Sequence, residues 1–152
     1  ITATGRRNPA STGARVVADA WDVYTPGRRY EEWDDAIVYG GQPRWTYCNP
    51  SRVWSGGCSA THNRAGATAT FTFTGTSVSW IGCRKGSASG TVDVYMDGIF
   101  QQRIRLSETY PIEGYQMTVF RKDGLPYGQH TITIEVVSDR SGYVVVDAFD
   151  VR

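Results

Sequence analysis

The 152-residue sequence lacks several features that mark common classes of protein. Its net charge at pH 7 is only +1 and its Lys and Arg residues are scattered, so it has no basic patch of the kind that binds nucleic acid. No apolar run approaches the ~20 residues of a transmembrane helix. No nucleophile elbow, phosphate-binding loop or metalloprotease helix signature is present. We therefore expect neither a nucleic-acid partner nor insertion into a membrane.

Cysteine is also scarce, and the three cysteines are Cys48, Cys58 and Cys83. No Cys-x-x-Cys spacing occurs, which argues against a zinc site. Cys48 and Cys58 flank a loop that contains Gly and Trp, a pattern that fits an oxidising compartment better than the cytosol. We expect a Cys48–Cys58 disulfide with Cys83 outside it, in a secreted or cell-surface protein, although three cysteines allow other pairings.

Alternation of small or aromatic residues with threonine is the clearest pattern present. From Ala67 to Thr74, alanines and phenylalanines point one way and threonines the other. Successive strand residues point to opposite faces of a sheet, so this pattern predicts a half-buried strand with a hydroxyl-rich outer face. Gly75 permits a turn, and Val78 and Trp80 resume the inward alternation. We expect Trp80 in the core because it is in phase with Val78.

Further strands are predicted at residues 33–41, 91–96, 99–106, 116–120, 131–137 and 143–151. Asp97 and Gly98 form a hairpin-turn signal between two of them. In the strand after this turn we expect Phe100, Ile104 and Leu106 to face inward. Around nine short strands without a helical period predict an all-β fold, an antiparallel β-sandwich.

Residues 1–24 resemble the C-terminal end of the same sequence, since Val16 to Val23 aligns with residues 145–151 with few changes. Such self-similarity indicates tandem modules. We expect residues 1–24 to be the last strands of a preceding copy, residues 25–29 a linker, and residues 30–152 one module of a longer protein with neighbouring modules. The leading hairpin must then join an edge of this module or swap between molecules. A chance likeness between two Val-rich strands is the alternative.

Residues 42–64 show no periodicity and contain several aromatic side chains. A loop of this length is uncommon in a compact domain unless it has a function. Trp45, Tyr47 and Trp54 would be exposed in such a loop, and exposed rings mark binding surfaces. His62, in the same segment, either contacts a ligand or caps the loop.

Four segments carry a resemblance to a known family: AGATATFTFTGTSVSWIG at 65–82, VYMDG at 94–98, GQHTI at 128–132 and VDAFDV at 146–151. Together they resemble the galactose-binding-like jelly-roll modules of bacterial carbohydrate-active enzymes and surface proteins. The resemblance covers roughly residues 30–152, and the loop at 42–64 departs from the family pattern. It implies a jelly roll that binds a polysaccharide or oligosaccharide without catalysis. Related jelly rolls serve as structural or adhesive repeats that bind protein or act as spacers, which is the alternative.

The resemblance also implies a structural calcium ion, because such modules often hold Ca²⁺ between an early carboxylate and one on the closing strand. Oxygen ligands suit this cation. The acidic residues at the corresponding places are Glu31, Glu32, Asp147 and Asp150. The alternative is that these acids are ordinary solvated or hydrogen-bonded side chains.

A sugar site needs an aromatic face for the C–H groups of the ring and polar groups for its hydroxyls. Basic side chains in the site would favour an acidic glycan, because Arg engages carboxylates in a bidentate manner. Tyr95 would instead line a concave sheet surface. The predicted ligand-binding residues are Trp45, Tyr47, Trp54, His62, Arg64, Arg84, Lys85 and Tyr95.

Catalysis is not expected from this sequence. Glycoside hydrolysis needs two acids that face one bond. In the doublets Glu31-Glu32 and Asp34-Asp35, adjacent side chains of a strand would point to opposite faces. His130, in a turn before a strand, is expected to be structural. A small glycan-active hydrolase or lyase is the third hypothesis, and it requires converging acids, or a His with an Arg, in one cleft.

Overall fold

The computed structural model describes residues 27–46, 53–62, 64–84, 90–107, 114–137 and 142–152. Residues 1–26 lie outside this part of the chain, so the repeat and the module boundary stay predictions. The elements in chain order are β1 Arg28–Glu31, β2 Ile37–Gly40, the short 3₁₀ turn η1 Ser55–Gly57, β3 Ala60–His62, β4 Thr68–Gly75, β5 Val78–Arg84, β6 Thr91–Met96, β7 Ile99–Arg105, β8 Gly114–Lys122, β9 Gly128–Val136, β10 Val144–Val146 and β11 Ala148–Val151.

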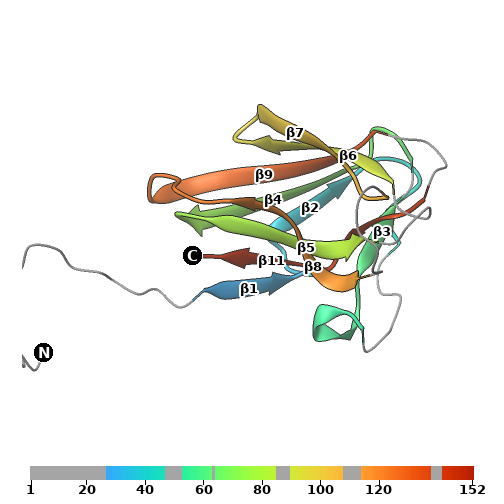
Figure 1. Cartoon of the computed structure of the whole chain (residues 1–152), viewed down its shortest axis with the longest axis horizontal. Helices are drawn as coiled ribbons and strands as arrows, with labels where there is room; N and C mark the ends of the chain where they lie inside the picture. Colours follow the sequence, from blue (N-terminus) through green and yellow to red (C-terminus); the bar gives the residue numbers. More distant parts are fainter. Residues whose placement is uncertain (1–26, 47–52, 63, 85–89, 108–113, 138–141) are drawn as a thin grey trace, which may run out of the picture.

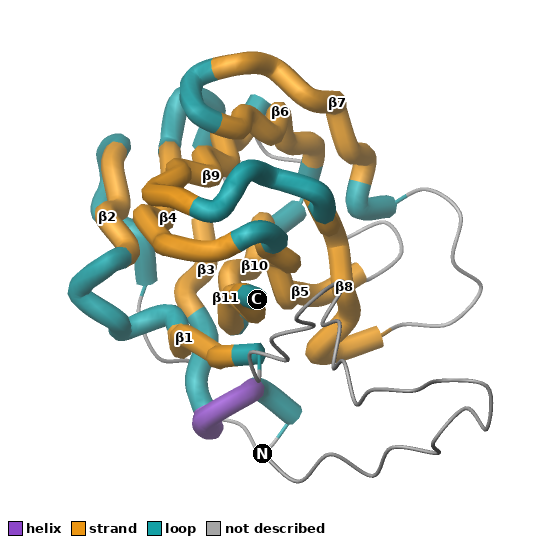
Figure 2. The backbone as a smooth tube through the Cα atoms, turned by 90° about the vertical axis from the view of Figure 1, so that its left-hand side faces the viewer, coloured by secondary structure: helices purple, strands orange, loops and turns teal. Residues whose placement is uncertain are grey.

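These strands form an antiparallel sandwich, which confirms the predicted fold class. One layer is a four-stranded sheet in the order β1-β11-β5-β8, and the other is a five-stranded sheet in the order β2-β4-β9-β6-β7. Figure 1 shows the five-stranded sheet above the four-stranded one, and Figure 2 views the same layers from one end. A third, two-stranded sheet pairs β10 with β3. In the described residues, no helix is long and apolar enough to cross a membrane.

Strand β4 follows the alternation read from the sequence. Ala69, Phe71 and Phe73 are buried, whereas the intervening threonines are half-buried or exposed. Strand β5 continues the pattern, and Trp80 is fully buried as predicted. The Trp80 indole N–H donates a 3.2 Å hydrogen bond to the carbonyl of Val145, so its one polar group is satisfied inside the core.

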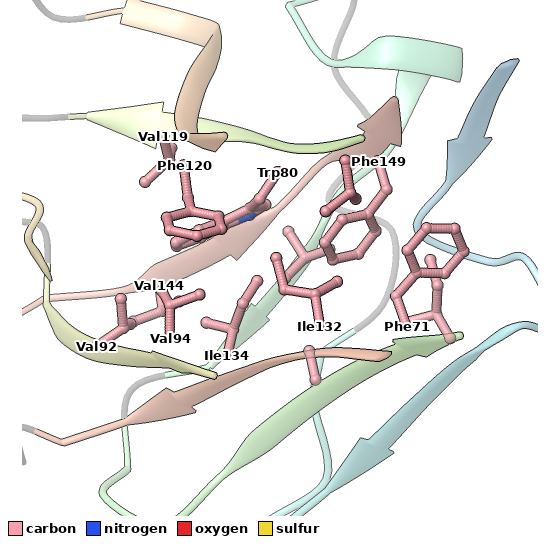
Figure 3. Close-up of a cluster of buried hydrophobic side chains, with 14 of the residues drawn as sticks. Phe71, Trp80, Val92, Val94, Val119, Phe120, Ile132, Ile134, Val144 and Phe149 are labelled. Atoms are coloured by element: carbon pink, nitrogen blue, oxygen red, sulfur yellow. The ribbon is translucent and has the colours of Figure 1, made fainter. Parts of the chain in front are cut away.

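Aromatic rings from both layers meet in the centre of the sandwich (Figure 3). Phe71 of β4 stacks on Phe149 of β11 with ring centroids 4.6 Å apart. The ring of Tyr30 in β1 also contacts Phe71, with ring centroids 5.0 Å apart. This packing joins three strands that lie far apart in the sequence.

The predicted inner face of the strand after Gly98 is correct for Ile104 and Leu106 but wrong for Phe100. Ile104 and Leu106 are buried, whereas Phe100 is 52% exposed. A register shift lies between Val94 and Tyr95 in the β6–β7 pair. Such an irregularity adds a residue to one strand and reverses which face the following side chains occupy. Phe100 therefore pairs with Tyr95 on the outer face.

The segment predicted as one strand at 143–151 is two strands in different sheets. Strand β10 pairs with β3, and β11 pairs with β1 and β5. Asp147 separates them and is fully buried. The backbone N–H of Asp147 donates to the carbonyl of Ile81 at 3.0 Å, so the chain stays bonded where it changes sheets.

Two predicted loop regions contain more regular structure than expected. Strand β1 begins at Arg28, inside the predicted linker 25–29, and pairs with β11. The predicted loop 42–64 contains η1 and β3, and Thr46 forms an isolated bridge with Thr61. Short hydrogen-bonded pieces without an alternating apolar pattern leave no periodic signal in a sequence.

His130 links two turns at one end of the sandwich, which agrees with its predicted structural role. Its Nδ1 lies 2.8 Å from Oδ2 of Asp97, in the β6–β7 turn, and its Nε2 lies 2.8 Å from the carbonyl of Pro126. Both neighbours accept hydrogen bonds, so the doubly protonated ring suits this place. The Pro126 carbonyl and then the Asp97 carboxylate raise the pKa of His130 above its ordinary value.

We expect His130 to make stability depend on pH. A pKa raised in the folded chain gives a contribution that is complete below about pH 6.5 and is lost as the pH rises through the raised value. Urea unfolding from acidic to alkaline pH is expected to show this loss in the wild type and not in His130→Gln. Identical pH profiles of the two proteins would contradict the assignment.

Candidate functional site

A polar pocket opens at the end of β2. Tyr39, Gly41, Gln42, Arg44 and Trp45 line it. Gln42 and Arg44 are exposed, so amide and guanidinium groups are available at its mouth. Of the predicted ligand-binding residues, Trp45 is the one in this lining. Tyr39, Gln42 and Arg44 were not singled out from the sequence, although they surround the Gly pair that precedes Trp45.

The wall of the pocket is held by Trp45. Its indole N–H donates a 3.0 Å hydrogen bond to the carbonyl of Gly40, at the end of β2. Its ring meets that of Tyr39 with centroids 5.0 Å apart. The Tyr39 hydroxyl in turn donates to the carbonyl of Glu32 at 2.9 Å. Trp45 is only 3% exposed and belongs to the core, so it offers the pocket little open aromatic surface.

His62 contacts the residues that form the pocket loop. Its Nδ1 accepts the backbone N–H of Arg64 at 3.0 Å, which leaves Nε2 to donate to the carbonyl of Pro43 at 2.6 Å. The His62 ring contacts Trp45 with centroids 5.3 Å apart, and His62 is 4% exposed. Of the two predicted roles, this geometry favours capping the loop. The Arg64 side chain is exposed.

Gly41 allows the pocket loop to lie close to β4. Its φ is +104°, a conformation that side-chain-bearing residues rarely adopt. A Cβ at this position would come within 2.7 Å of the Cα of Ala67. Gly41 therefore lets the chain turn against β4 and places Gln42 and Arg44 at the mouth.

The expectation of one open aromatic platform is wrong for the described residues. Trp54 lies in a separate buried cluster with Cys83 and Val145, and Tyr115 meets its ring edge-on at 4.9 Å. No local pattern predicts this packing, because Trp54 contacts residues that are far away in the chain. Tyr47 lies outside the described residues.

Other predicted ligand residues are dispersed. Arg84 donates a 3.3 Å hydrogen bond to the carbonyl of Val119, in β8. Tyr95 lies on the outer face of the five-stranded sheet, opposite Thr133. Lys85 lies outside the described residues. The ligand-binding roles of all these residues remain predictions.

Three of the four acids predicted to bind calcium lie near one another, where the end of β1 approaches the residue between β10 and β11. Glu31 Oε2, Glu32 Oε2 and Asp147 Oδ2 are each buried without a hydrogen-bond partner. Two other oxygens of these acids do have partners. Ser55 donates from its hydroxyl to Glu31 Oε1 at 2.9 Å and from its backbone N–H to Asp147 Oδ1 at 2.8 Å. Buried acceptors without donors are costly, so this cluster needs a compensating charge or proton.

Burial dominates the electrostatics of the cluster. The pKa of Glu32 is raised to about 7, first by loss of solvent and then by the neighbouring carboxylates of Asp147 and Glu31. The pKa of Asp147 is likewise raised to about 7, first by burial and then by Glu31, against the lowering effect of the Ser55 N–H. The three acids thus repel one another in a site of low polarity.

Asp150, the fourth predicted ligand, is engaged elsewhere. Arg29 donates from Nε and Nη2 to its two carboxylate oxygens at 2.7 and 2.8 Å. This bidentate pair satisfies Asp150 and is partly exposed. The calcium prediction therefore reduces to Glu31, Glu32 and Asp147.

Oxygen donors of this kind fit the chemistry of Ca²⁺. Their arrangement in this structure does not fit a metal ion. In the described part of the chain, no group of three or more His, Cys, Asp or Glu side chains has the geometry to hold one. Calcium remains a prediction, and its test is a stability measurement.

Cys83 is buried and in the thiol form. Cys48 lies outside the described residues, so the Cys48–Cys58 disulfide stays a prediction.

Comparisons with known proteins connect the chain to carbohydrate chemistry. No protein-family model matches it. It is 33% identical over 116 residues to the A type blood N-acetyl-alpha-D-galactosamine deacetylase of Flavonifractor plautii. It is 34% identical over 118 residues to the A type blood alpha-D-galactosamine galactosaminidase of the same organism. Each match covers 76% of this chain but only 14% and 10% of those relatives, so the chain corresponds to a small part of either protein.

Solved structures share the fold. The CBM36-1 domain of a multidomain xylanase from the hindgut metagenome of Trinervitermes trinervoides superposes with a TM-score of 0.54 at 15% identity, covering 82% of this chain and 94% of that domain. An exo-beta-1,3-galactanase from Phanerochaete chrysosporium gives a TM-score of 0.56 at 21% identity, over 83% of this chain and 29% of that one. These similarities support the β-sandwich architecture. The sequence identities are too low to transfer a ligand from these structures to this chain.

Proposed function

We propose that the chain is a non-catalytic carbohydrate-binding module of the galactose-binding-like type, which directs a larger secreted or surface protein to a polysaccharide or oligosaccharide. The pocket at Tyr39 to Trp45 is the observation that carries this proposal. It brings the aromatic residues Tyr39 and Trp45 together with the amide of Gln42 and the guanidinium of Arg44, which can donate hydrogen bonds to sugar hydroxyls.

Two facts about the relatives support the proposal: the chemistry for which they are named, and the small share of their length that the chain covers. Both Flavonifractor plautii proteins are named for chemistry on galactosamine, and the chain matches a segment of about a tenth to a seventh of each. A segment of that size suits an accessory module better than a whole catalytic apparatus. We therefore infer that glycans ending in N-acetyl-α-D-galactosamine or α-D-galactosamine are the first ligands to test.

The buried acids argue against the hydrolase or lyase alternative. Glu32 is 2% exposed and Asp147 is fully buried, so neither carboxylate is open to a glycan. His62 is buried against Trp45 and spends both ring nitrogens on the backbone. A structural or adhesive repeat remains the alternative that the binding experiment must exclude.

Arg44→Gln is expected to weaken glycan binding about tenfold or more, because hydrogen bonds from a charged group contribute more than neutral ones. The measurement is calorimetric titration with an N-acetyl-α-D-galactosamine-terminated oligosaccharide, an α-D-galactosamine-terminated one, xylan and polygalacturonate. A preference for polygalacturonate would identify an acidic ligand.

Arg121→Gln is the matched control, because Arg121 is also an exposed arginine and is paired locally with Asp123 at 2.7 Å. Its affinity is expected to equal that of the wild type. If the folded wild type binds none of the four glycans, the structural-repeat alternative replaces this proposal. If both Arg variants bind as the wild type does, the pocket is not the site.

A further inference from the structure

The first and the last strand of the sandwich meet at one of its ends. Strand β1 begins at Arg28, which pairs with Val151, the last residue of β11. Gly27 lies beside the C-terminal residue, since a Cβ on Gly27 would come within 3.4 Å of Cγ of Arg152. Figure 1 shows the start of β1 and the C-terminus on the same side of the molecule. The described chain therefore starts and finishes at the same end of the sandwich.

Hydrogen bonds connect the C-terminus to the segment before β9. The carbonyl of Arg152 accepts the backbone N–H of Ser77 at 3.0 Å, and the N–H of Leu125 donates to the carbonyl of Thr76 at 2.9 Å. Tyr127 follows two residues after Leu125 and is 81% exposed. Among the large apolar and aromatic residues in the described ranges, Tyr127 is the most exposed.

The β6–β7 turn lies at the same end of the sandwich. His130 holds it there, because its two ring nitrogens contact Asp97 of that turn and the carbonyl of Pro126, the residue before Tyr127. Ile99 directly follows the turn and is 68% exposed. The surface at this end, which we call the terminus face, is defined by four exposed residues: Arg28, Ile99, Tyr127 and Arg152.

The pocket lies at the opposite end of the sandwich. The first residue of β4, Thr68, pairs with Gly40 beside the pocket. The last residue of β4, Gly75, pairs with Gly128, which follows Tyr127. A strand of 8 residues separates the two ends by roughly 23 Å. A partner on the terminus face therefore leaves the pocket open.

The internal repeat indicates which partner lies next to this face. Residues 20–23 (AWDV) align with β11 (AFDV), so that Val23 corresponds to Val151. In a preceding copy of the module, Val23 would therefore end the last strand at the terminus face of that copy. Only residues 24–27 separate it from Arg28, where β1 of this module begins. The five Cα–Cα steps from Val23 to Arg28 span at most about 18 Å.

The position after Val23 differs between the two copies in a way that suits a contact. Tyr24 takes the place that Arg152 has in this copy. A tyrosine ring there would meet the exposed arginines Arg28 and Arg152 of the facing module, and a guanidinium over an aromatic ring is attractive. Two arginines facing each other would repel instead.

We propose that the terminus face binds the equivalent face of the preceding copy of this module, the copy whose last strand is residues 20–23. The proposal rests on the predicted tandem repeat and is separate from glycan binding. The chain would leave one copy and enter the next at the same kind of face, so the short connection holds the two faces opposite each other. Tethering gives a partner a high effective concentration, so a weak contact through Tyr127 and Ile99 keeps the copies together. The two pockets then lie at the far ends of the pair.

The test extends the full chain by a second copy. In this tandem chain, residues 1–151 are followed directly by residues 24–152, which repeats the natural junction after Val23. Amide hydrogen exchange and thermal unfolding are compared with those of the 152-residue chain. Because a covered face opens less often, we expect exchange at residues 97–100 to slow at least about threefold in the tandem. The melting temperature is expected to rise by about 3 °C.

Tyr127→Ala in both copies is expected to abolish the slower exchange at residues 97–100 and the rise in melting temperature. Tyr143→Ala in both copies is the matched control, because Tyr143 is a 57% exposed tyrosine at the other end of the sandwich. The next residue, Val144, pairs with His62 beside the pocket loop. This control is expected to behave as the unsubstituted tandem does.

The proposal is overturned if the tandem exchanges and melts as the single chain does, because the copies are then independent. It is also overturned if Tyr143→Ala and Tyr127→Ala have equal effects. Sedimentation of the single chain provides a further test. A stable dimer with the same protection at residues 97–100 would show that the face joins separate molecules, which contradicts a contact that depends on the linker. None of these measurements involves a glycan, so their outcome is independent of the proposed binding function.

Discussion

Glu32→Gln is expected to raise the free energy of unfolding of the metal-free chain by about 2 kcal/mol at pH 8. The carboxylate of Glu32 is 2% exposed and has an oxygen without a hydrogen-bond partner. Its pKa is raised from 4.5 to about 7, first by burial. The difference between these values corresponds to about 3 kcal/mol at most, and a neutral amide that fits the site removes most of this cost.

The gain should depend on pH in one direction. Because the folded chain binds the Glu32 proton more tightly than the unfolded chain, the cost is absent at about pH 4 and grows until the pH passes the raised pKa. Urea unfolding of the wild type and Glu32→Gln in chelator, at about pH 4 and pH 8, measures this difference. An equal effect at both pH values would show that the carboxylate is not desolvated as the structure has it.

A calcium ion bound by the cluster would reverse the sign of the effect. If Glu31, Glu32 and Asp147 take up Ca²⁺, a concentration of 100 times the dissociation constant stabilises the wild type by about 2.7 kcal/mol. Glu32→Gln and Asp147→Asn would lose most of this stabilisation. Asp150→Asn is the control, because Asp150 is paired with Arg29 and should respond to Ca²⁺ as the wild type does. A wild-type melting temperature that ignores Ca²⁺ would refute the calcium prediction.

Phe149→Ala is expected to lower the free energy of unfolding by about 3–5 kcal/mol, the usual cost of removing a buried aromatic ring. Phe149 is fully buried and stacks on Phe71 at 4.6 Å. Its loss would leave a cavity between the two sheets. Since small domains are typically stable by only about 5–15 kcal/mol, this one change would bring the fold close to its limit.

Phe100→Ala provides the control for this prediction, because it removes the same ring from a place where it is 52% exposed. Its effect on unfolding should stay within about 0.5 kcal/mol. Denaturant unfolding followed by intrinsic tryptophan fluorescence measures both variants. Comparable losses in the two would mean that the sheets do not pack through Phe149.

Sequence reasoning located strands best where one face is buried and the other is wet. The alternation around Phe71 and Trp80 placed both in the core, and the Asp97-Gly98 signal located a hairpin turn. It failed for Phe100, because a one-residue irregularity reverses the faces of a strand and has no composition of its own.

The candidate site was harder to predict than the fold. Trp45 was identified, but as an exposed ring, whereas it is buried between Tyr39 and His62. A polar segment that contains tryptophans is predicted to be an exposed loop, because the residues that pack on it lie elsewhere in the chain. Arg44 gave no signal, since a single exposed arginine is common on any surface.

Local sequence patterns were enough to predict the class of fold, because alternating side chains and turn residues act over short stretches of chain. The resemblance to a known family also singled out the acids Glu31, Glu32, Asp147 and Asp150 as calcium ligands. Three outcomes came from long-range packing: which of these acids lie together, that Asp150 pairs with Arg29, and that Phe100 faces outward. Those contacts depend on strand order and register, which are set by the packing of the two sheets and not by any local stretch of residues.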